Sequence, residues 1–185
     1  KPDAGVKYSK ITGLADELCL ARQAESVLID RIPGKSTVGI QIPNPNRELI
    51  SMRELLEADI YKRSASKLTL AMGKTIHGEP YISDLATMPH LLIAGSTGTG
   101  KSVSVNAMLS SILFRATPDD VRFIMVDPKR VELTGYNGIP HLIAPVVTDL
   151  ERIVGVLKWV TREMDERYKK FSNAGARNIE DYNSH

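Results

Sequence analysis

GSTGTGKS, residues 95–102, is the stretch of this chain that decides its fold class. It fits the pattern GxxxxGK[ST], in which glycines let the backbone turn tightly around phosphates and N–H groups at a helix N-terminus point toward them. In this pattern Lys101 supplies a positive charge for the β and γ phosphates, and the Ser102 hydroxyl is placed to bind Mg²⁺. The sequence therefore predicts a site for ATP or GTP.

Apolar segments on both sides of this motif have the order that such a site needs, which is strand, glycine-rich loop and helix. Residues 90–94, HLLIA, follow Pro89 and form a short apolar run that predicts a buried strand. Residues 102–115 carry apolar side chains close to helical spacing and predict a helix. This context favours a nucleotide site over a glycine-rich turn with a solvated lysine.

A second apolar run, VRFIMV at residues 121–126, follows the predicted helix. Two parallel strands joined by a helix are the start of a doubly wound sheet. Residues 141–147 could form a third strand, but Pro145 limits them to a sheet edge or an irregular segment. The fold class predicted here is α/β with a mainly parallel sheet.

The first third of the chain has a pattern of its own. Apolar residues at helical spacing between Ile11 and Ala21 predict a helix, and residues 27–32 and 37–42 predict two strands. Ser51 with Glu54, three residues later, is a capping box that predicts the start of a short helix. Together these elements predict a small α+β module.

The boundary of that module falls in the polar stretch at residues 62–66. Residues 67–72 and 79–82 flank a polar connection and predict a hairpin that leads into the nucleotide-binding part. We therefore expect two domains, residues 1–65 and residues 66–185.

A long amphipathic helix is predicted near the end of the chain. Thr148 with Glu151 is a second capping box, and an apolar stripe at helical spacing follows it. The expected function of this stripe is packing on the sheet, and the mixed charges of the opposite face indicate a solvated surface more than a contact with DNA. The stripe consists of Leu150, Ile153, Val154, Leu157, Val160, Met164 and Tyr168.

Composition narrows the function classes further. The net charge of +2 is too small for a general basic field that would by itself indicate nucleic acid. Cys19 is the single cysteine, which excludes an internal disulfide, and no apolar run reaches the ~18 residues of a membrane span. We therefore expect these residues to make no membrane contact. We also expect no histidine metal site, because no metal-ligand spacing joins the histidines, His77, His90, His141 and His185.

Asp127 has two interpretations. It ends the VRFIMV run, as does the acid that holds the Mg²⁺ shell in nucleotide hydrolases. Pro128 and Lys129 follow it, however, and this favours a turn or a loop anchor. No later apolar run ends in Asp-Glu, so the chain is expected to lack part of the hydrolytic site.

Several longer phrases resemble the FtsK/SpoIIIE family of bacterial DNA translocases. The resemblance extends from about Lys10 to the end of the chain. The phrases are PGKSTVGIQIPN at residues 33–44, MPHLLIAGSTGTGKSVSVN at 88–106, FIMVDPKRVEL at 123–133, YNGIPHLIAPVVTD at 136–149 and RNIEDYN at 177–183.

This resemblance implies the C-terminal part of an α domain followed by the first part of a RecA-like P-loop NTPase domain, truncated before its Walker B strand. It implies a hexameric ring that uses ATP and Mg²⁺ to pump duplex DNA in chromosome segregation and cell division or sporulation. The parent protein would be anchored in the bacterial inner membrane with its motor at the cytoplasmic face. Lys101 and Ser102 carry over as catalytic residues, with Ser102 on the metal. The implied nucleotide-binding residues are Gly95, Ser96, Thr97, Gly98, Thr99, Gly100, Lys101, Ser102 and Val103.

Two other functions stay open at this point. One is a related motor for protein secretion or conjugative DNA transfer, and the other is an assembly module that binds nucleotide without turnover. The family's Asp-Glu strand, trans-acting arginine and DNA loops normally lie downstream of the RNIEDYN phrase. The resemblance therefore implies that these residues alone hydrolyse ATP poorly.

Overall fold

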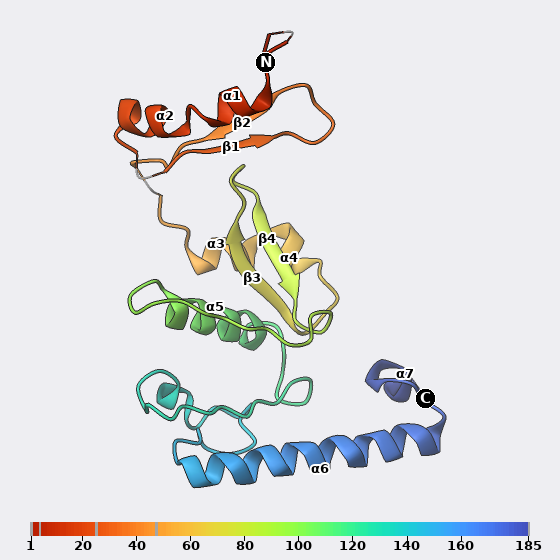
Figure 1. Cartoon of the computed structure of the whole chain (residues 1–185). Helices are drawn as coiled ribbons and strands as arrows, with labels where there is room; N and C mark the ends of the chain where they lie inside the picture. Colours follow the sequence, from red (N-terminus) through yellow and green to blue (C-terminus); the bar gives the residue numbers. More distant parts are fainter. Residues whose placement is uncertain (1, 4, 25, 47, 185) are drawn as a thin grey trace. The chain divides into compact units, whose positions relative to one another are not determined.

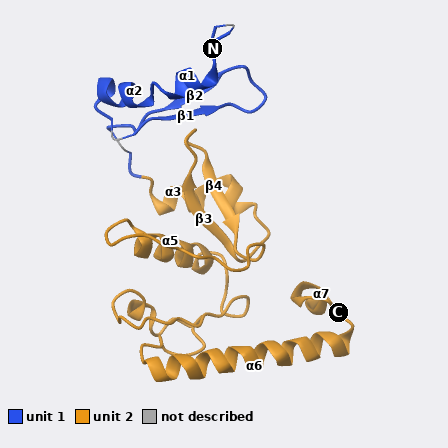
Figure 2. Cartoon of the chain, viewed as in Figure 1, with its two compact units in different colours: residues 1–49 blue, residues 50–185 orange. Residues whose placement is uncertain are grey.

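The structure is a computed structural model that describes residues 2–3, 5–24, 26–46 and 48–184. His185, one of the histidines considered above, lies outside the described residues. The chain divides into two compact units, Lys1–Leu49 and Ile50–His185 (Figure 2). The domain boundary expected after residue 65 stays a prediction.

The first unit contains two short helices and one antiparallel hairpin (Figure 1). Ile29 is buried in β1 and lies opposite Ile40 of β2, and the Tyr8 hydroxyl donates to the Ile29 carbonyl at 2.9 Å. The helix expected between Ile11 and Ala21 is interrupted at Gly13, a residue that favours helix ends over helix interiors. The elements are α1 (Tyr8–Thr12), α2 (Ala15–Arg22), β1 (Leu28–Arg31) and β2 (Val38–Gln41).

The second unit begins with two short helices and the predicted second hairpin. The Ser51 cap is confirmed, because the Ser51 hydroxyl accepts the Glu54 N–H at 3.2 Å where α3 begins. A bulge between Ala71 and Gly73 interrupts the antiparallel register of the hairpin. The elements are α3 (Met52–Glu57), α4 (Asp59–Lys62), β3 (Thr69–Lys74) and β4 (Pro80–Asp84).

The core of this unit lies on both faces of β3. Leu70 packs with Ile112 and Ala116 at the end of helix α5 (Lys101–Leu113), whereas Ala71 packs with the α3–α4 pair through Leu55 and Tyr61. Successive strand residues point to opposite faces, so a two-stranded hairpin joins two helical layers (Figure 1). Helix α5, and with it the start of the predicted nucleotide site, is thereby anchored on the hairpin.

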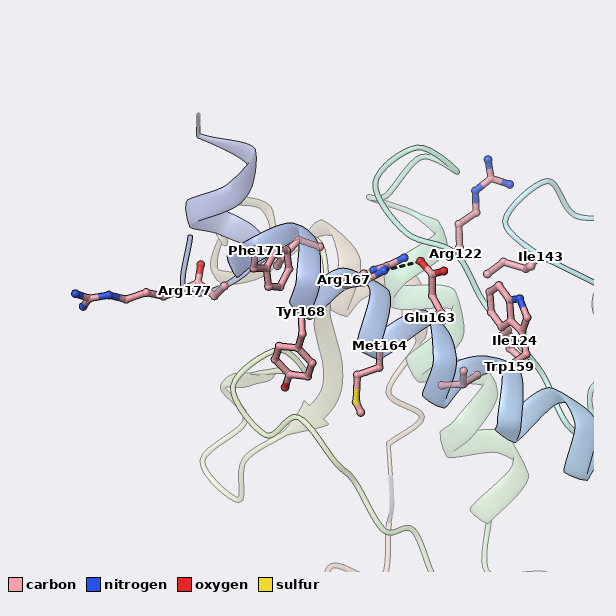
Figure 3. A pocket seen from close by; sticks show the side chains of 13 residues that line it. Arg122, Ile124, Ile143, Trp159, Glu163, Met164, Arg167, Tyr168, Phe171 and Arg177 are labelled. Carbon is pink, nitrogen blue, oxygen red and sulfur yellow. Dashed lines mark hydrogen bonds and ion pairs between the residues drawn. The ribbon is translucent and has the colours of Figure 1, made fainter. Parts of the chain in front are cut away.

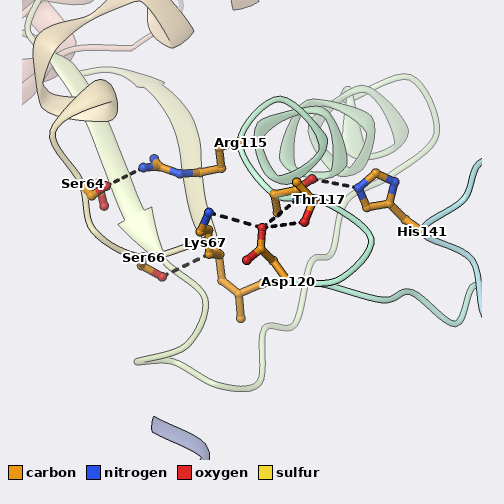
Figure 4. A network of polar contacts seen from close by, with 9 residues as sticks. Ser64, Ser66, Lys67, Arg115, Thr117, Asp120 and His141 are labelled. Atoms are coloured by element: carbon orange, nitrogen blue, oxygen red, sulfur yellow. Dashed lines mark hydrogen bonds and ion pairs between the residues drawn. The ribbon is translucent and has the colours of Figure 1, made fainter. Parts of the chain in front are cut away.

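Polar contacts strengthen the attachment at the C-terminal end of α5. Arg115 donates to the carbonyls of Tyr61 and Ser64, and its guanidinium lies 4.8 Å from the centre of the Tyr61 ring. On the opposite side, His141 Nε2 lies 2.8 Å from the Ala116 carbonyl (Figure 4). Lys67 pairs with Asp120 at 3.3 Å. These contacts hold the residues that follow α5 close to the hairpin.

The strand predicted at residues 90–94 is wrong. This segment forms no ladder with any described residue, and Leu92 is 93% exposed. A strand exists only through hydrogen bonds to a neighbour, and an apolar run does not specify that neighbour. The short apolar pattern was thus incorrect about both the strand and its burial.

The predicted parallel sheet is also wrong, since the described sheets are two antiparallel hairpins. Residues 121–127 and 141–147 meet only at two isolated parallel bridges, Phe123 with Leu142 and Val126 with Val147. The reason is Pro145, which has no N–H to continue the ladder from Ile143; the Val147 N–H donates to the Met125 carbonyl instead, at 2.9 Å.

The C-terminal part contains η1 (Thr134–Tyr136), the long helix α6 (Leu150–Ala174) and the short α7 (Ile179–Asn183). The cap of α6 is one residue later than predicted, because the Asp149 carboxylate accepts the Glu151 N–H at 3.0 Å. The predicted packing of the apolar stripe on a sheet is wrong. No residue of α6 is buried, and Leu157 is 58% exposed.

Candidate nucleotide-binding site

The loop before α5 has the backbone that its glycines predict. Gly98 and Gly100 have φ angles of 84° and 92°, in the left-handed region that side chains disfavour. Between them, Thr99 donates twice to the Ser96 carbonyl, through its N–H at 3.3 Å and its hydroxyl at 2.8 Å. The loop is therefore a closed turn held by its own residues.

Gly95 is required for a different reason. A Cβ atom at this position would lie 2.5 Å from the Thr99 hydroxyl oxygen, which is closer than nonbonded atoms allow. The turn can close over residue 95 only because that residue has no side chain. Thus Gly95 and Thr99 depend on each other within the motif.

Helix α5 starts directly after this turn, with Gly100 as its N-cap. The Ser104 N–H donates to the Gly100 carbonyl at 2.8 Å, so the N–H groups of Lys101, Ser102 and Val103 precede the first intrahelical bond. Free N–H groups at a helix N-terminus attract anions. All the residues that the sequence predicted for nucleotide binding lie in this turn and the first helical turn.

Glu132 is a residue of this region that the sequence reasoning missed. Its Oε1 atom lies 3.7 Å from Lys101 Nζ, and both side chains are about one third exposed, at 32% and 39%. The contact joins residues from different elements, so neither spacing nor periodicity could predict it. The phrase FIMVDPKRVEL, which contains Glu132, was the only available signal.

Asp127 accounts for the position of Glu132. The Asp127 carboxylate is buried and accepts backbone N–H groups from Arg130 at 3.0 Å and from Glu132 and Leu133 at 2.9 Å each. These bonds hold the pKa of Asp127 below its usual value, and those from Leu133 and Glu132 have the largest effect. With both oxygens occupied in this way, the geometry favours the loop-anchor interpretation of Asp127 over the metal-contact interpretation.

A second contact joins the same loop to α5. The Tyr136 hydroxyl donates to Asn106 Oδ1 at 2.7 Å, and the Asn106 amide donates to the Ser102 carbonyl at 2.9 Å. We refer to residues 127–137 as the Asp127 loop. This loop contacts α5 at Lys101 and again at Asn106, about one helical turn further on.

A separate cavity of about 660 Å³ lies along α6 and includes no residue of the predicted site. Figure 3 shows the apolar and the charged side chains that line it, with Arg167 paired to Glu163 at 2.9 Å. Its labelled apolar residues are Ile124, Ile143, Trp159, Met164, Tyr168 and Phe171, and its other arginines are Arg122 and Arg177.

Neither a cluster of metal ligands nor a membrane-spanning helix is present among the described residues. No three histidine, cysteine, aspartate or glutamate side chains among them lie together as a metal site would require. None of the helices in the described ranges combines the length and the apolar character needed to span a membrane.

Comparison with known sequences identifies the family. The sequence model of the FtsK/SpoIIIE family matches residues 51–185, and that of the FtsK alpha domain matches residues 1–44. The chain belongs to the FtsK/SpoIIIE family. The two matches meet near the border between the two compact units, Leu49 and Ile50.

Relatives within this FtsK/SpoIIIE family are similar over the whole chain. Proteins named DNA translocase FtsK from Brucella melitensis and Azospirillum brasilense are 50% identical over 183 and 184 residues, which is 99% and 100% of this chain. The chain spans 22% and 29% of their respective lengths. One from Rickettsia bellii is 48% identical over 100% of this chain and 25% of its own length.

A solved structure has a similar fold. The pCW3 conjugation coupling protein TcpA, in its monomer form with ATPγS, matches with a TM-score of 0.56 and 22% identity. The match covers 97% of this chain and 48% of that protein.

Proposed function

We propose that this chain is part of an ATP-driven motor that translocates double-stranded DNA in bacterial chromosome segregation and cell division or sporulation. The observation that carries the proposal is about 50% identity to DNA translocases FtsK over the whole chain. The chain itself contains a complete GxxxxGKS motif. Partners of the intact protein would be duplex DNA and further copies of itself in a hexameric ring. Its motor would lie at the cytoplasmic face of the inner membrane, to which the intact protein is anchored.

The geometry at α5 supports ATP with Mg²⁺ as the ligand. The turn formed by Gly95, Ser96, Thr97, Gly98, Thr99 and Gly100 would surround the phosphates, and the first N–H groups of α5, including that of Val103, would point to them. Lys101 would neutralise phosphate charge, and the Ser102 hydroxyl would bind Mg²⁺. Bound Mg²⁺ neutralises phosphate charge as it develops during phosphoryl transfer.

The test is ATP turnover by the intact protein carrying Lys101→Ala. We expect turnover to fall to background while the fold is retained, because the main fixed charge at the phosphates is lost. Ser102→Ala should instead raise the Mg²⁺ concentration needed for turnover. Lys158→Ala, which removes an exposed lysine from α6, is the control and should hydrolyse ATP at the normal rate. Normal turnover by Lys101→Ala would show that the site assignment is incorrect.

DNA dependence separates this function from its alternatives. A duplex translocase should hydrolyse ATP faster when duplex DNA is added. Stimulation only by single-stranded DNA or by a protein substrate would favour a conjugation or secretion motor. Nucleotide binding without turnover in the intact protein would favour an assembly module.

A further inference from the structure

The Asp127 loop has a fixed shape. Three backbone N–H groups converge on the Asp127 carboxylate. Arg130 adopts a left-handed φ of 60°, which lets the backbone turn around that carboxylate. At the far end, the Asn137 side chain accepts the Val146 N–H at 2.8 Å. The backbone of Glu132 is itself one of the groups that Asp127 holds. The loop therefore positions the backbone from which the Glu132 side chain extends.

The Glu132 side chain extends toward Lys101. The carboxylate and the ammonium group lie 3.7 Å apart, and the Tyr136 to Asn106 bond keeps the loop at the same helix. Asp127, the nearest other carboxylate of the loop, is buried and already accepts three N–H groups. Glu132 is thus the acid of this loop that pairs with the lysine of the GKS motif.

We propose that Glu132 competes with the phosphates of the nucleotide for Lys101, so that nucleotide binding is coupled to the Asp127 loop. The proposal rests on the nucleotide site proposed above. Phosphates bound at the N-terminus of α5 need the same ammonium group that pairs with Glu132. A carboxylate beside them would also repel them, more strongly for free ATP than for its Mg²⁺ complex, which carries less negative charge.

The test is calorimetric titration of the full chain with ATPγS, with Mg²⁺ and with EDTA. Glu132→Gln keeps the size of the side chain and removes its charge. We expect its Kd for Mg²⁺-free ATPγS to be about two- to fivefold lower than that of the unsubstituted chain, the range for a partly exposed ion pair. The change in the presence of Mg²⁺ should be smaller. Glu151→Gln, which removes an exposed acid from α6, should leave both values unchanged.

Hydrogen exchange tests the coupling to the loop. In the unsubstituted chain, ATPγS should accelerate exchange of the amides of Arg130, Glu132 and Leu133, since the loop loses one of its contacts with α5. In Glu132→Gln these amides should exchange at one rate with and without ATPγS. A variant that is merely unfolded would show fast exchange throughout the chain and would not bind more tightly.

Equal affinities for Glu132→Gln and the unsubstituted chain would overturn the proposal. Weaker binding by Glu132→Gln would overturn it as well, because Glu132 would then support the ligand. In both cases, binding that Lys101→Ala abolishes would leave the nucleotide site itself standing. Failure of the unsubstituted chain to bind ATPγS would overturn the nucleotide site and the proposal together.

Discussion

Asp127 illustrates how a single buried carboxylate can organise a loop through hydrogen bonds from the backbone. It is 5% exposed and accepts N–H groups from three residues of its own loop. A neutral acid at this position would present a hydroxyl to donors and lose part of these bonds. The loop therefore depends on the ionised form.

This dependence predicts how stability changes with pH. The pKa of Asp127 is lower in the folded chain than its ordinary value, chiefly because of the Leu133 and Glu132 N–H groups. Its contribution should be fully present above pH ~4 and should disappear as the pH falls through the lowered pKa. Asp127→Asn should reduce stability at neutral pH and flatten the pH dependence below pH ~4, as measured by thermal unfolding at each pH.

The matched control is Asp119→Asn, an exposed aspartate for which no hydrogen bond is observed. It should leave the curve unchanged. An Asp127→Asn curve parallel to that of the unsubstituted chain would contradict the anchoring role.

At the scale of residues, the sequence predicted the features that depend only on residues close together in the chain. Gly98, Gly100 and Lys101 lie within a few residues of one another, so their spacing predicts a turn and a helix start. Glu132 could not be found in this way, because its approach to Lys101 depends on how the Asp127 loop folds back toward α5. Asp127 itself was found from its position after an apolar run, but only its contacts favour one of its two interpretations.

At the scale of elements, α5 and α6 show that similar apolar patterns can have different surroundings. Ile112 of α5 is 3% exposed and packs against Leu70 of β3. Leu157 of α6 is 58% exposed although the helix is clearly amphipathic. An apolar stripe indicates that a helix has a face to cover, whereas burial depends on what is available to cover it.

The two helices therefore predict different responses to truncation. Ile112→Ala should lower the free energy of unfolding of the second unit by about 2–5 kcal/mol, as core truncations do. Leu157→Ala should change it by less than about 0.5 kcal/mol, as surface substitutions do. Urea unfolding of both variants, followed by circular dichroism, is the measurement. Comparable losses in the two variants would show that the α6 stripe is covered in solution.

The elements that the sequence predicted well are those complete within a short segment. The two strands of the first unit, the hairpin of the second unit and the Ser51 cap depend on turn chemistry and on bonds between near neighbours. The strands expected at residues 90–94 and 121–126 needed partners from elsewhere. Pro145 was recognised as a source of irregularity, but the shift of the Val147 N–H to the Met125 carbonyl requires three-dimensional register.

At the scale of the whole molecule, some segments that connect helices and strands are highly exposed. Leu49, at the end of the first unit, and Leu92, before the glycine-rich turn, are each 93% exposed and lie outside the helices and strands. Leu20 is 82% exposed but lies within α2. Exposed segments outside helices and strands enter a protease active site more readily than helices, which must first unfold locally.

Limited digestion with thermolysin should consequently cut first at Leu49 and at Leu92, and later at Leu20. Mass spectrometry of the early fragments identifies the bonds that are cut. Leu49→Asp and Leu92→Asp should each remove one early cut and leave the other. Protection of Leu92 in the unsubstituted chain would indicate that residues 90–94 are covered in solution.

The close approach of residues 95 and 99 couples the substitutions that this turn tolerates at the two positions. Alanine at position 95 conflicts with the threonine hydroxyl, and that hydroxyl is held in place by its bond to Ser96. Alanine at position 99 removes the conflicting oxygen. Thr99→Ala should therefore make alanine at position 95 better tolerated, so the effects of the two substitutions on stability should not be additive.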